Sequence, residues 1–498
     1  MPKEAVLALD LGTGGCKASL WEADGACVAE VFHPYPTHHP RPGWSEHAWA
    51  DWRSAVANCC RQVLAQQDDR PVLGMAVSGH SLGMVLLDSA GQPLERTTPI
   101  WSDTRAVAVA EAVLRDLDER EWYSRTGNGF SPALYPLFKA RWYQAHRPET
   151  WQRCATIIGS KDLVNYWLTG QIGTDYSYAS GSGVFELETG DYADDLMCAG
   201  GIGRGQLPEA GPSQRLVGRV TQEAAREFGL PADLPVFAGA VDNASMALGS
   251  RGTGEGRAYA SLGSSSWITV TSRRPVLDFE ARPFVFAHAL PGHFASALST
   301  FSSGTSMEWL GDLVRPGSTL EDLLDQGAAL AGDGDLPVVW PTLSGGTPLE
   351  GGSRVRGMIA GLDLSHRGAE LARAMMEGIA FSLARSWERL SRLAEVKGDL
   401  LISGGGSRHA GWNQLYADII QRPLVTSGVG QQAAALGAAA IAYVGLGEWA
   451  WHDADKAHAI SATYLPVRHQ AYLARRRVFD QLQSFAAEVA AATTQGDG

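Results

Sequence analysis

The sequence lacks long hydrophobic runs, a basic surplus and paired cysteine motifs. Its longest small or apolar stretch, Ala433 to Val444, is too short to span a bilayer, and no basic-then-apolar leader precedes the first strand. The formal net charge of −13 argues against a general binder of nucleic acid or acidic membranes, because phosphate groups attract a basic face. The 6 cysteines show no CxxC spacing, which indicates reduced thiols. We therefore expect a cytoplasmic protein that binds neither nucleic acid nor membrane.

The remaining composition is that of an ordinary folded chain. Apolar residues make up 45% of its 498 positions and charged residues 19%. A chain of this length is too long for a single hydrophobic core, so we expect two or three domains. A locally positive pocket for one anionic ligand remains compatible with the acidic balance.

A glycine turn between two strand-like segments opens the chain. Leu7 to Asp10 is typical of a buried strand that ends in a carboxylate, and a strand pattern resumes after the turn Gly12-Thr13-Gly14-Gly15. Backbone N–H groups of the turn, the Thr13 hydroxyl and the Lys17 ammonium could hold an anion such as phosphate. The pattern GxxxxGK[ST] of the P-loop is absent, and an ordinary hairpin turn is the alternative.

A second copy of this hairpin lies about half a chain further on. Ala258 to Ser272 repeats the plan of strand, small-residue turn and strand. Gly263, Ser264 and Ser265 stand where Gly12, Thr13 and Gly14 stand in the first copy. Two such hairpins predict two related domains that face one nucleotide, each offering its turn to the phosphates.

Polar residues follow another buried-type strand, Val72 to Val77. The strand ends in Ser78-Gly79-His80-Ser81-Leu82-Gly83, at the position where open α/β sheets bind ligands. His80 could hydrogen-bond a substrate hydroxyl or hold the turn. Further along, Asp103 and Arg105 could grip hydroxyls, or they could pair with each other at a helix start.

The second strand-end acid is Asp242. Apolar and small residues precede it from Pro235 onward, and a small-residue helix begins after it. Burial at such an edge would raise its proton affinity, as a base that takes a hydroxyl proton requires. An aspartate that caps its own helix is the alternative.

Three other stretches of small residues bear on a binding site. Thr174 to Gly183 has too many small residues for a core and suits a binding surface or a sharp connection. The backbone of Gly404-Gly405-Gly406 could lie flat against a planar ligand such as a nucleobase, which a side chain would block. The alanines and glycine between Gln431 and Gly445 permit close helix contact.

The order of these motifs resembles the FGGY family of carbohydrate kinases, and within it the xylulose kinases. The resemblance covers nearly the whole chain, and Gly357 to Glu377, GMIAGLDLSHRGAELARAMME, is similar to the family's C-terminal signature. The other matching fragments, in chain order, are DLGTGGCK, GWSEHAWADWR, IWSDTR, KDLVNYWLTG, TDYSYAS, GAVDNA, SLGSSSW, ISGGGSR and AALGAA.

The resemblance implies an α/β fold with two ribonuclease-H-like domains of the actin and sugar-kinase type around a central cleft. Residues 1–245 would form the sugar and phosphate side, and residues 246–498 the nucleotide side. The implied reaction moves the γ-phosphate of ATP to a hydroxyl of a ketopentose, with D-xylulose giving D-xylulose 5-phosphate and Mg²⁺ as cofactor. The expected partner is a small-molecule sugar, and a homodimer is left open.

The same resemblance implies a role for each candidate residue. Asp242 would be the catalytic base and Asp10 would help to hold Mg²⁺. Contacts to the sugar would come from His80, Ser81, Leu82, Asp103, Asp242 and Asn243, and contacts to ATP from Gly12, Thr13, Gly14, Lys17, Gly263, Ser264, Ser265, Gly404, Gly405 and Gly406.

The sequence departs from the family at the sugar-contacting strand end. Xylulose kinases usually carry a GQMHG-like segment, whereas this chain has Gly79-His80-Ser81-Leu82-Gly83, so Leu82 stands at the customary histidine. Two alternatives therefore stay open. One is a kinase of another ketose or of a polyol such as glycerol or erythritol. The other is a non-catalytic actin-like ATP-binding protein, against which the retention of Asp10 and Asp242 argues.

Overall fold

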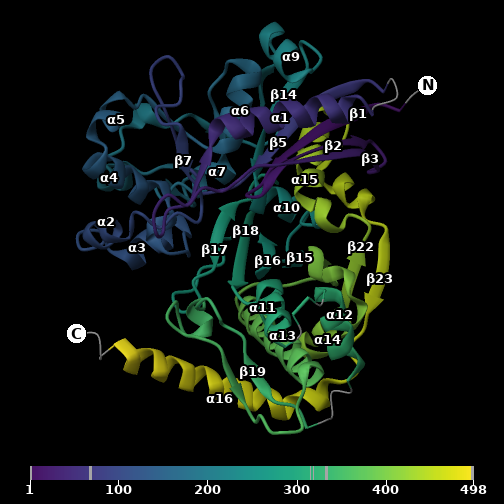
Figure 1. Ribbon diagram of the computed structural model, residues 1–498. Coiled ribbons are helices and arrows are strands. Elements are labelled where there is room, and N and C mark those ends of the chain that lie inside the picture. Colours follow the sequence, from purple (N-terminus) through teal and green to yellow (C-terminus); the bar gives the residue numbers. More distant parts are fainter. Residues whose placement is uncertain (1–2, 67–69, 315, 318, 331–334, 495–498) are drawn as a thin grey trace.

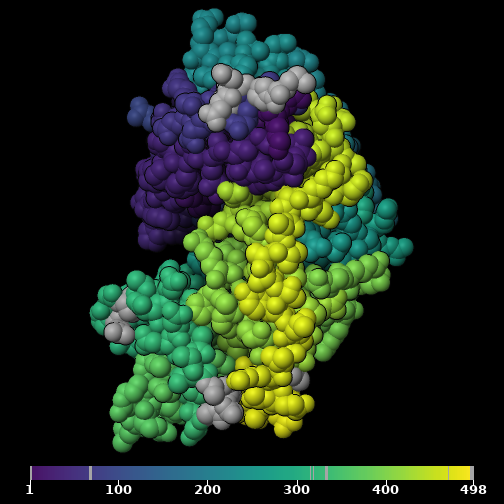
Figure 2. Space-filling view, turned by 90° about the vertical axis from the view of Figure 1, so that its right-hand side faces the viewer, coloured from purple at the N-terminus to yellow at the C-terminus, as the bar shows by residue number. Residues whose placement is uncertain are grey.

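The computed structural model describes residues 3–66, 70–314, 316–317, 319–330 and 335–494. These residues form two large mixed β-sheets with helices between and around them (Figure 1). Figure 2 shows an indentation between the purple amino-terminal part and the teal and green part below it. The arrangement confirms the predicted α/β fold with two domains of the same plan.

The first sheet has the strand order β13-β14-β5-β1-β2-β3. Three strands, β1, β5 and β14, run parallel to one another, and the others are antiparallel to their neighbours. The strands are β1 (Ala5–Leu11), β2 (Gly15–Glu22), β3 (Cys27–Pro34), β5 (Val72–Gly79), β13 (Leu216–Arg219) and β14 (Pro235–Val241).

Helices cover both faces of this sheet, which explains why β1 reads as a continuous apolar run. Leu7 and Leu9 pack in one core cluster with α1 (Trp49–Leu64), whereas Val6 and Ala8 pack in another with α15 (Ala433–Leu446). The alternation follows from the two-residue repeat of a strand.

The second sheet has the order β17-β18-β16-β15-β21-β22-β23. Here β15, β21 and β22 run parallel, and the antiparallel strands flank them. The strands are β15 (Ala258–Leu262), β16 (Ser266–Ser272), β17 (Phe284–Ala287), β18 (Phe294–Thr300), β21 (Leu400–Ser403), β22 (Leu424–Ser427) and β23 (Ile460–Tyr464). Apart from the added edge strand β17, this is the plan of the first sheet, which confirms the repeat inferred from the two hairpins.

The other elements surround the two sheets. The helices are α2 (Val107–Val113), α3 (Glu119–Thr126), α4 (Pro136–His146), α5 (Pro148–Arg153), α6 (Ser160–Thr169), α7 (Tyr176–Ser180), α8 (Asp194–Gly200), α9 (Gln222–Phe228), α10 (Asp242–Gly249), α11 (Gly304–Val314), α12 (Leu320–Ala329), α13 (Gly368–Leu393), α14 (Ala410–Ile420) and α16 (His469–Thr494). Short strands are β4 (Glu46–Ala48), β6 (Val85–Leu87), β7 (Thr97–Pro99), β8 (Thr156–Ile158), β9 (Thr174–Asp175), β10 (Phe185–Glu186), β11 (Asp191–Tyr192), β12 (Ala210–Gly211), β19 (Val338–Trp340) and β20 (Met358–Ala360).

The prediction for Thr174 to Gly183 is wrong. Its small, polar residues favour a binding surface or a sharp connection, but the structure buries most of the stretch as β9 and α7. Asp175 and Ser177 are fully buried there. Small polar residues can enter a core when other buried groups satisfy their hydrogen bonds, as they do here.

The helices α10 and α15 lie between the two sheets. Their backbones approach so closely that glycine is needed at the contact. A Cβ atom at Gly249 of α10 would lie 1.8 Å from the carbonyl oxygen of Ala433, and a Cβ at Gly437 of α15 would lie 1.9 Å from that of Ser245. Because α15 packs on β1, β5 and β14, a helix from the last part of the chain covers the first sheet (Figure 1). The expected close helix contact near Gly437 is thereby confirmed.

Within the ranges that the structure describes, no helix has the length and apolar character needed to cross a membrane.

Replacing Gly437 with alanine should destabilise the fold. The added methyl group would overlap backbone atoms of α10, so we expect a loss of about 3 kcal/mol or more in the free energy of unfolding, measured by chemical denaturation. Gly254→Ala is the matched control, because a Cβ there meets nothing within 4 Å. Equal stability of the two variants would contradict the described helix contact.

Candidate active site

Both strand-end aspartates lie at one edge of the first sheet. Leu11 and Val241 are each in register with Gly79 of β5, so the carboxyl ends of three parallel strands meet there. Asp10 is the penultimate residue of β1, and Asp242 directly follows β14. This is the edge at which parallel sheets bind ligands.

Asp10 is partly buried and faces Lys17 across the β1–β2 ladder. Burial raises the pKa of the Asp10 carboxyl, while the neighbouring Ser78 hydroxyl and the Lys17 ammonium act in the opposite direction. Lys17 also lies 3.7 Å from Glu30. The predicted metal-holding acid and the predicted phosphate-binding cation are therefore neighbours.

Asp242 is the first residue of α10, and the capping position belongs to Val241. Its Oδ1 accepts from the backbone N–H of Asn243 (2.8 Å) and from Asn243 Nδ2 (2.9 Å). Burial raises the pKa of the Asp242 carboxyl to about 6, and the charge of Asp10 adds to the rise. The helix-capping alternative does not match this geometry, and a carboxyl with this pKa is largely ionised at neutral pH.

The turn after β5 places its residues in different surroundings. The Nδ2 of Asn243 lies 3.5 Å from the Ser81 hydroxyl, so Ser81 and Asn243 lie beside Asp242, and their contact with a sugar stays a prediction. His80 is buried between the rings of His47 and Trp52, and its pKa falls to about 3 because of burial. It is better explained as packing beneath the turn than as a sugar contact.

Leu82 has a left-handed backbone, with φ of 58°, and its side chain is buried beside Gly181 and Phe286. A branched aliphatic residue adopts this conformation only at a cost, so the surroundings must hold it. Lys139 on α4 does so, because its buried ammonium donates to the carbonyl oxygens of Leu82 (2.9 Å) and Ile100 (2.8 Å). Burial lowers the pKa of Lys139 to about 7. Sequence reasoning did not find this role for Lys139.

Asp103 and Arg105 pair with each other, which is the second of the two alternatives drawn from the sequence. Arg105 Nε donates to Asp103 Oδ1 (2.7 Å), and the other oxygen of Asp103 accepts from the backbone of Ser45 (2.7 Å). Arg105 also bonds Glu46 at 2.5 Å. The Asp103 carboxylate is fully buried and engaged in this pairing.

The first glycine turn projects from the sheet edge. Thr13 and Gly14 are exposed, and Gly12 donates its N–H to the carbonyl of Gly15 at 3.0 Å. Trp101, whose side chain sequence reasoning overlooked, is 40% exposed and donates from Nε1 to the Thr13 hydroxyl at 3.0 Å. An exposed indole beside the glycine turn that follows β1 is a candidate platform for an apolar sugar face.

The second turn and the glycine run lie together at the end of the second sheet. Ser261 of β15 is in register with Ser403 of β21, so Gly263 and Gly404 follow neighbouring parallel strands. Gly404 has φ of 87°, and a Cβ atom there would lie 2.6 Å from the carbonyl of Leu262. Only glycine can hold the run this close to the turn. Ser264 and Gly405 are exposed to solvent.

The two sheets approach each other near Asp242. Burial raises the pKa of the Tyr259 phenol on β15 to about 12, and the charge of Asp242 contributes to that rise. Gln432, which directly precedes α15, donates to Glu30 on β3 at 2.8 Å. Asp242 therefore lies where the first sheet meets the second.

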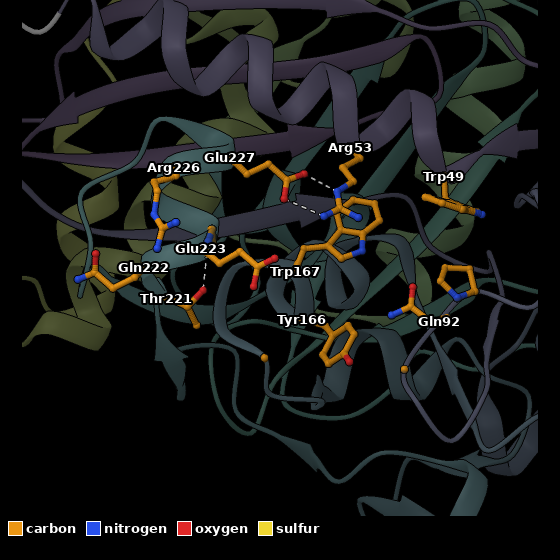
Figure 3. A pocket seen from close by; sticks show the side chains of 14 residues that line it. Trp49, Arg53, Gln92, Tyr166, Trp167, Thr221, Gln222, Glu223, Arg226 and Glu227 are labelled. Atoms are coloured by element: carbon orange, nitrogen blue, oxygen red, sulfur yellow. Dashed lines mark hydrogen bonds and ion pairs between the residues drawn. The ribbon is translucent and has the colours of Figure 1, made fainter.

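A cavity in the amino-terminal part lies away from these residues. It has a volume of about 530 Å³ and lies among α1, α6, α9 and residues 91–93 (Figure 3). In Figure 3, Arg53 points toward Glu227, which it bonds at 2.7 Å, and Trp167 lies beside the guanidinium. These charged groups neutralise each other, and the lining contains none of the predicted site residues.

Comparisons with known proteins agree with the arrangement. A family model for the N-terminal domain of the FGGY family of carbohydrate kinases matches residues 5–249, and one for the C-terminal domain matches residues 258–446. The xylulose kinase of Escherichia coli (strain K12) is 29% identical over 483 residues, with 96% of this chain and 98% of the relative covered. A glycerol kinase of Thermococcus gammatolerans is 27% identical over 456 residues, with 89% of this chain and 90% of the relative covered.

Among solved structures, a xylulose kinase from Rhodospirillum rubrum superimposes with a TM-score of 0.87 at 28% identity, with 99% of each chain covered. The resemblance inferred from the motifs is thus confirmed over nearly the whole chain. Because one family model matches each half, the chain belongs to the FGGY family of carbohydrate kinases and is an ATP-dependent sugar kinase.

Proposed function

We propose that this kinase transfers the γ-phosphate of ATP to a hydroxyl of a ketopentose, with D-xylulose as substrate and D-xylulose 5-phosphate as product. The observation that carries the proposal is the convergence of Asp10 and Asp242 at one sheet edge, next to Tyr259 of the second sheet. The xylulose kinases among the relatives support the choice of sugar.

In this proposal Asp242 is the catalytic base. Its pKa of about 6 leaves most of the carboxylate ionised near neutral pH, while its proton affinity stays higher than that of an exposed aspartate. It takes the proton of the sugar hydroxyl as that oxygen bonds to the γ-phosphorus, and the bond from phosphorus to the β,γ-bridging oxygen breaks to release ADP. Asn243 and the Ser81 backbone hold the carboxylate in place.

ATP would lie between the two glycine-bearing edges. Backbone N–H groups of Gly12 to Gly14 and of Gly263 to Ser265 would contact the phosphates, with the Thr13 hydroxyl and Lys17. Gly404, Gly405 and Gly406 would border the adenosine, where the lack of side chains admits a planar base.

Mg²⁺ fits the donor set at the first edge. Among the described residues, no group of three or more His, Cys, Asp or Glu side chains is arranged to enclose a metal ion. Mg²⁺ in phosphoryl-transfer sites commonly uses one or two carboxylates together with phosphate oxygens and water. Asp10 would hold the ion, and the bound cation would neutralise charge on the phosphate oxygens.

Three further features belong to the proposal. Residues 1–245 would act as the sugar and phosphate side and residues 246–498 as the nucleotide side. A homodimer stays a prediction that sedimentation analysis would check. We also expect the enzyme to work in the cytoplasm, where ATP is supplied.

A kinase of another ketose or of a polyol is the second candidate. Leu82 supports it, since an aliphatic side chain offers no hydrogen bond to a sugar hydroxyl at the position where the family usually has histidine. A non-catalytic ATP-binding role is disfavoured because Asp10 and Asp242 are both present and adjacent.

A substrate screen separates the sugars. We expect ADP release, followed by a coupled assay, to be fastest with D-xylulose and at least about tenfold slower with glycerol or erythritol, because one missing contact costs about 1–3 kcal/mol. Robust turnover of a polyol alone would remove the xylulose assignment.

Replacing Asp242 with asparagine should remove the proton acceptor. We expect kcat to fall by about 10²- to 10⁴-fold, while ATP and sugar binding, measured by calorimetry, change little. Asp233→Asn, at an exposed turn, is the matched control and should keep wild-type turnover. Wild-type turnover in the Asp242 variant would refute the proposed base.

The pH dependence should report the same carboxyl. We expect kcat/KM to fall about tenfold per pH unit below about pH 6, since protonated Asp242 cannot accept the hydroxyl proton. A pH profile of kcat/KM that stays flat well below this value would contradict the assignment.

The free energy of unfolding should fall as the pH rises, whereas kcat/KM should rise. The folded pKa of Asp242 is raised above the unfolded value, so stability is highest below the unfolded pKa and is lost as pH rises through about 6. Near neutral pH, Asp242→Asn should therefore be about 1 to 3 kcal/mol more stable than the wild type by denaturation. The difference should vanish at about pH 4 or below.

A further inference from the structure

The strand that delivers Asp242 leaves regular pairing just before it ends. The register of β14 against β5 shifts between Phe237 and Ala240. Gly239 in this bulge has φ of 72°, and a Cβ atom there would lie 1.9 Å from the carbonyl oxygen of Val77. A bulge redirects the end of a strand, and it also frees backbone groups that need other partners.

Groups outside the sheet take over these hydrogen bonds. The carbonyl oxygen of Ala238 accepts from Asn165 Nδ2 (3.0 Å) and from Lys161 Nζ (3.4 Å), both on α6. The N–H of Gly239 donates to the backbone carbonyl of Ser213 at 3.0 Å. Hydrogen bonds with α6 and with Ser213 therefore fix the backbone of Ala238 and Gly239 in the bulge.

The last of these contacts is made by Ser177 of α7. The N–H of Val241, the residue next to Asp242, donates to the Ser177 hydroxyl at 2.9 Å. That hydroxyl donates in turn to Asp175 Oδ2 at 2.6 Å. Ser177 and Asp175 are both fully buried. A hydroxyl that donates to a carboxylate keeps its lone pairs directed at the incoming N–H.

Asp175 is itself anchored by a buried cation. Lys161 Nζ lies 2.8 Å from Asp175 Oδ1 and 2.5 Å from Asp162 Oδ1. Burial opposes the charge on Lys161, but the two carboxylates outweigh it and raise the pKa of Lys161. Asp162 is satisfied further by the Thr174 hydroxyl at 2.8 Å. Such a cluster is costly to break and therefore holds one geometry.

We propose that Ser177, anchored on Asp175 and Lys161, is a positioning residue that sets where the Asp242 carboxylate stands relative to the sugar hydroxyl. The inference rests on the proposed role of Asp242 as the base. Ser177 does not touch the Asp242 side chain. It acts through the backbone, because its hydroxyl holds the N–H of Val241, the residue directly before Asp242. A shift of about 1 Å in a reacting group can cost about a hundredfold in rate, so this contact bears on catalysis as well as on folding.

A matched pair of variants separates positioning from simple core packing. Ser177→Ala removes the acceptor of the Val241 N–H, together with one hydrogen bond to Asp175. Ser213→Ala also removes a hydroxyl bond to Asp175 Oδ2 (2.9 Å), but the backbone carbonyl that Ser213 offers to β14 remains. Both serines are buried, so the two changes perturb the same buried carboxylate.

Steady-state kinetics with ATP and the sugar give the main readout. Ser177→Ala should lower kcat by about tenfold or more while the KM for ATP stays within about twofold. The low-pH limb of kcat/KM should also move to lower pH, because a carboxylate that relaxes toward water loses part of its burial. Ser213→Ala should keep kcat within about twofold and leave the pH limb unchanged.

Ser177→Cys guards against a folding defect, and it fills nearly the same space with a weaker acceptor. Its kcat should fall between those of the wild type and Ser177→Ala. Equal kcat and equal pH profiles for the Ser177 and Ser213 variants would overturn the positioning role. Asp242→Asn, measured alongside, tells the two proposals apart: if it keeps turnover, the base assignment fails, whereas an inactive Asp242→Asn with unaffected Ser177 variants refutes only the inference about Ser177.

Discussion

The contact between α10 and α15 is the constraint on which the site depends. Gly249 and Gly437 bring the two helix backbones so close that a methyl group on either would overlap a carbonyl oxygen of the other helix. Asp242 begins α10, and α15 begins directly after Gln432 in the second half of the chain. The proposed base and the proposed nucleotide loops are thus joined through one tightly packed helix pair, which limits how far they can move independently.

The two sheets repeat one topology. In each sheet a hairpin supplies one of three parallel strands, and the carboxyl ends of those three strands lie side by side. Parallel strands bring chain segments of distant sequence number to one edge. Asp10 and Asp242, separated by almost half the chain, are therefore neighbours, and the charge of one raises the pKa of the other.

Several buried charges surround the site. Lys139 holds the strained turn at Leu82, the Asp103–Arg105 pair fixes the segment that carries Trp101, and Lys161 anchors the residues behind β14. Desolvated charges are costly unless they are paired, so each one demands a defined set of partners. These charged groups fix the shape of the loops that border the proposed site.

Periodicity and residue type were sufficient to predict the two hairpins, both strand-end acids and the small-residue helix around Gly437, because these features depend on neighbours in sequence. Residue type alone left His80 and Asp103 undecided between binding and structure, since a polar side chain serves either purpose, and it wrongly kept Thr174 to Gly183 out of the core. Tertiary packing decided those cases: it enclosed His80 between aromatic rings, paired Asp103 with Arg105 and buried Asp175 and Ser177 beneath β14. These outcomes depend on contacts between segments far apart in the chain, which local sequence patterns do not encode.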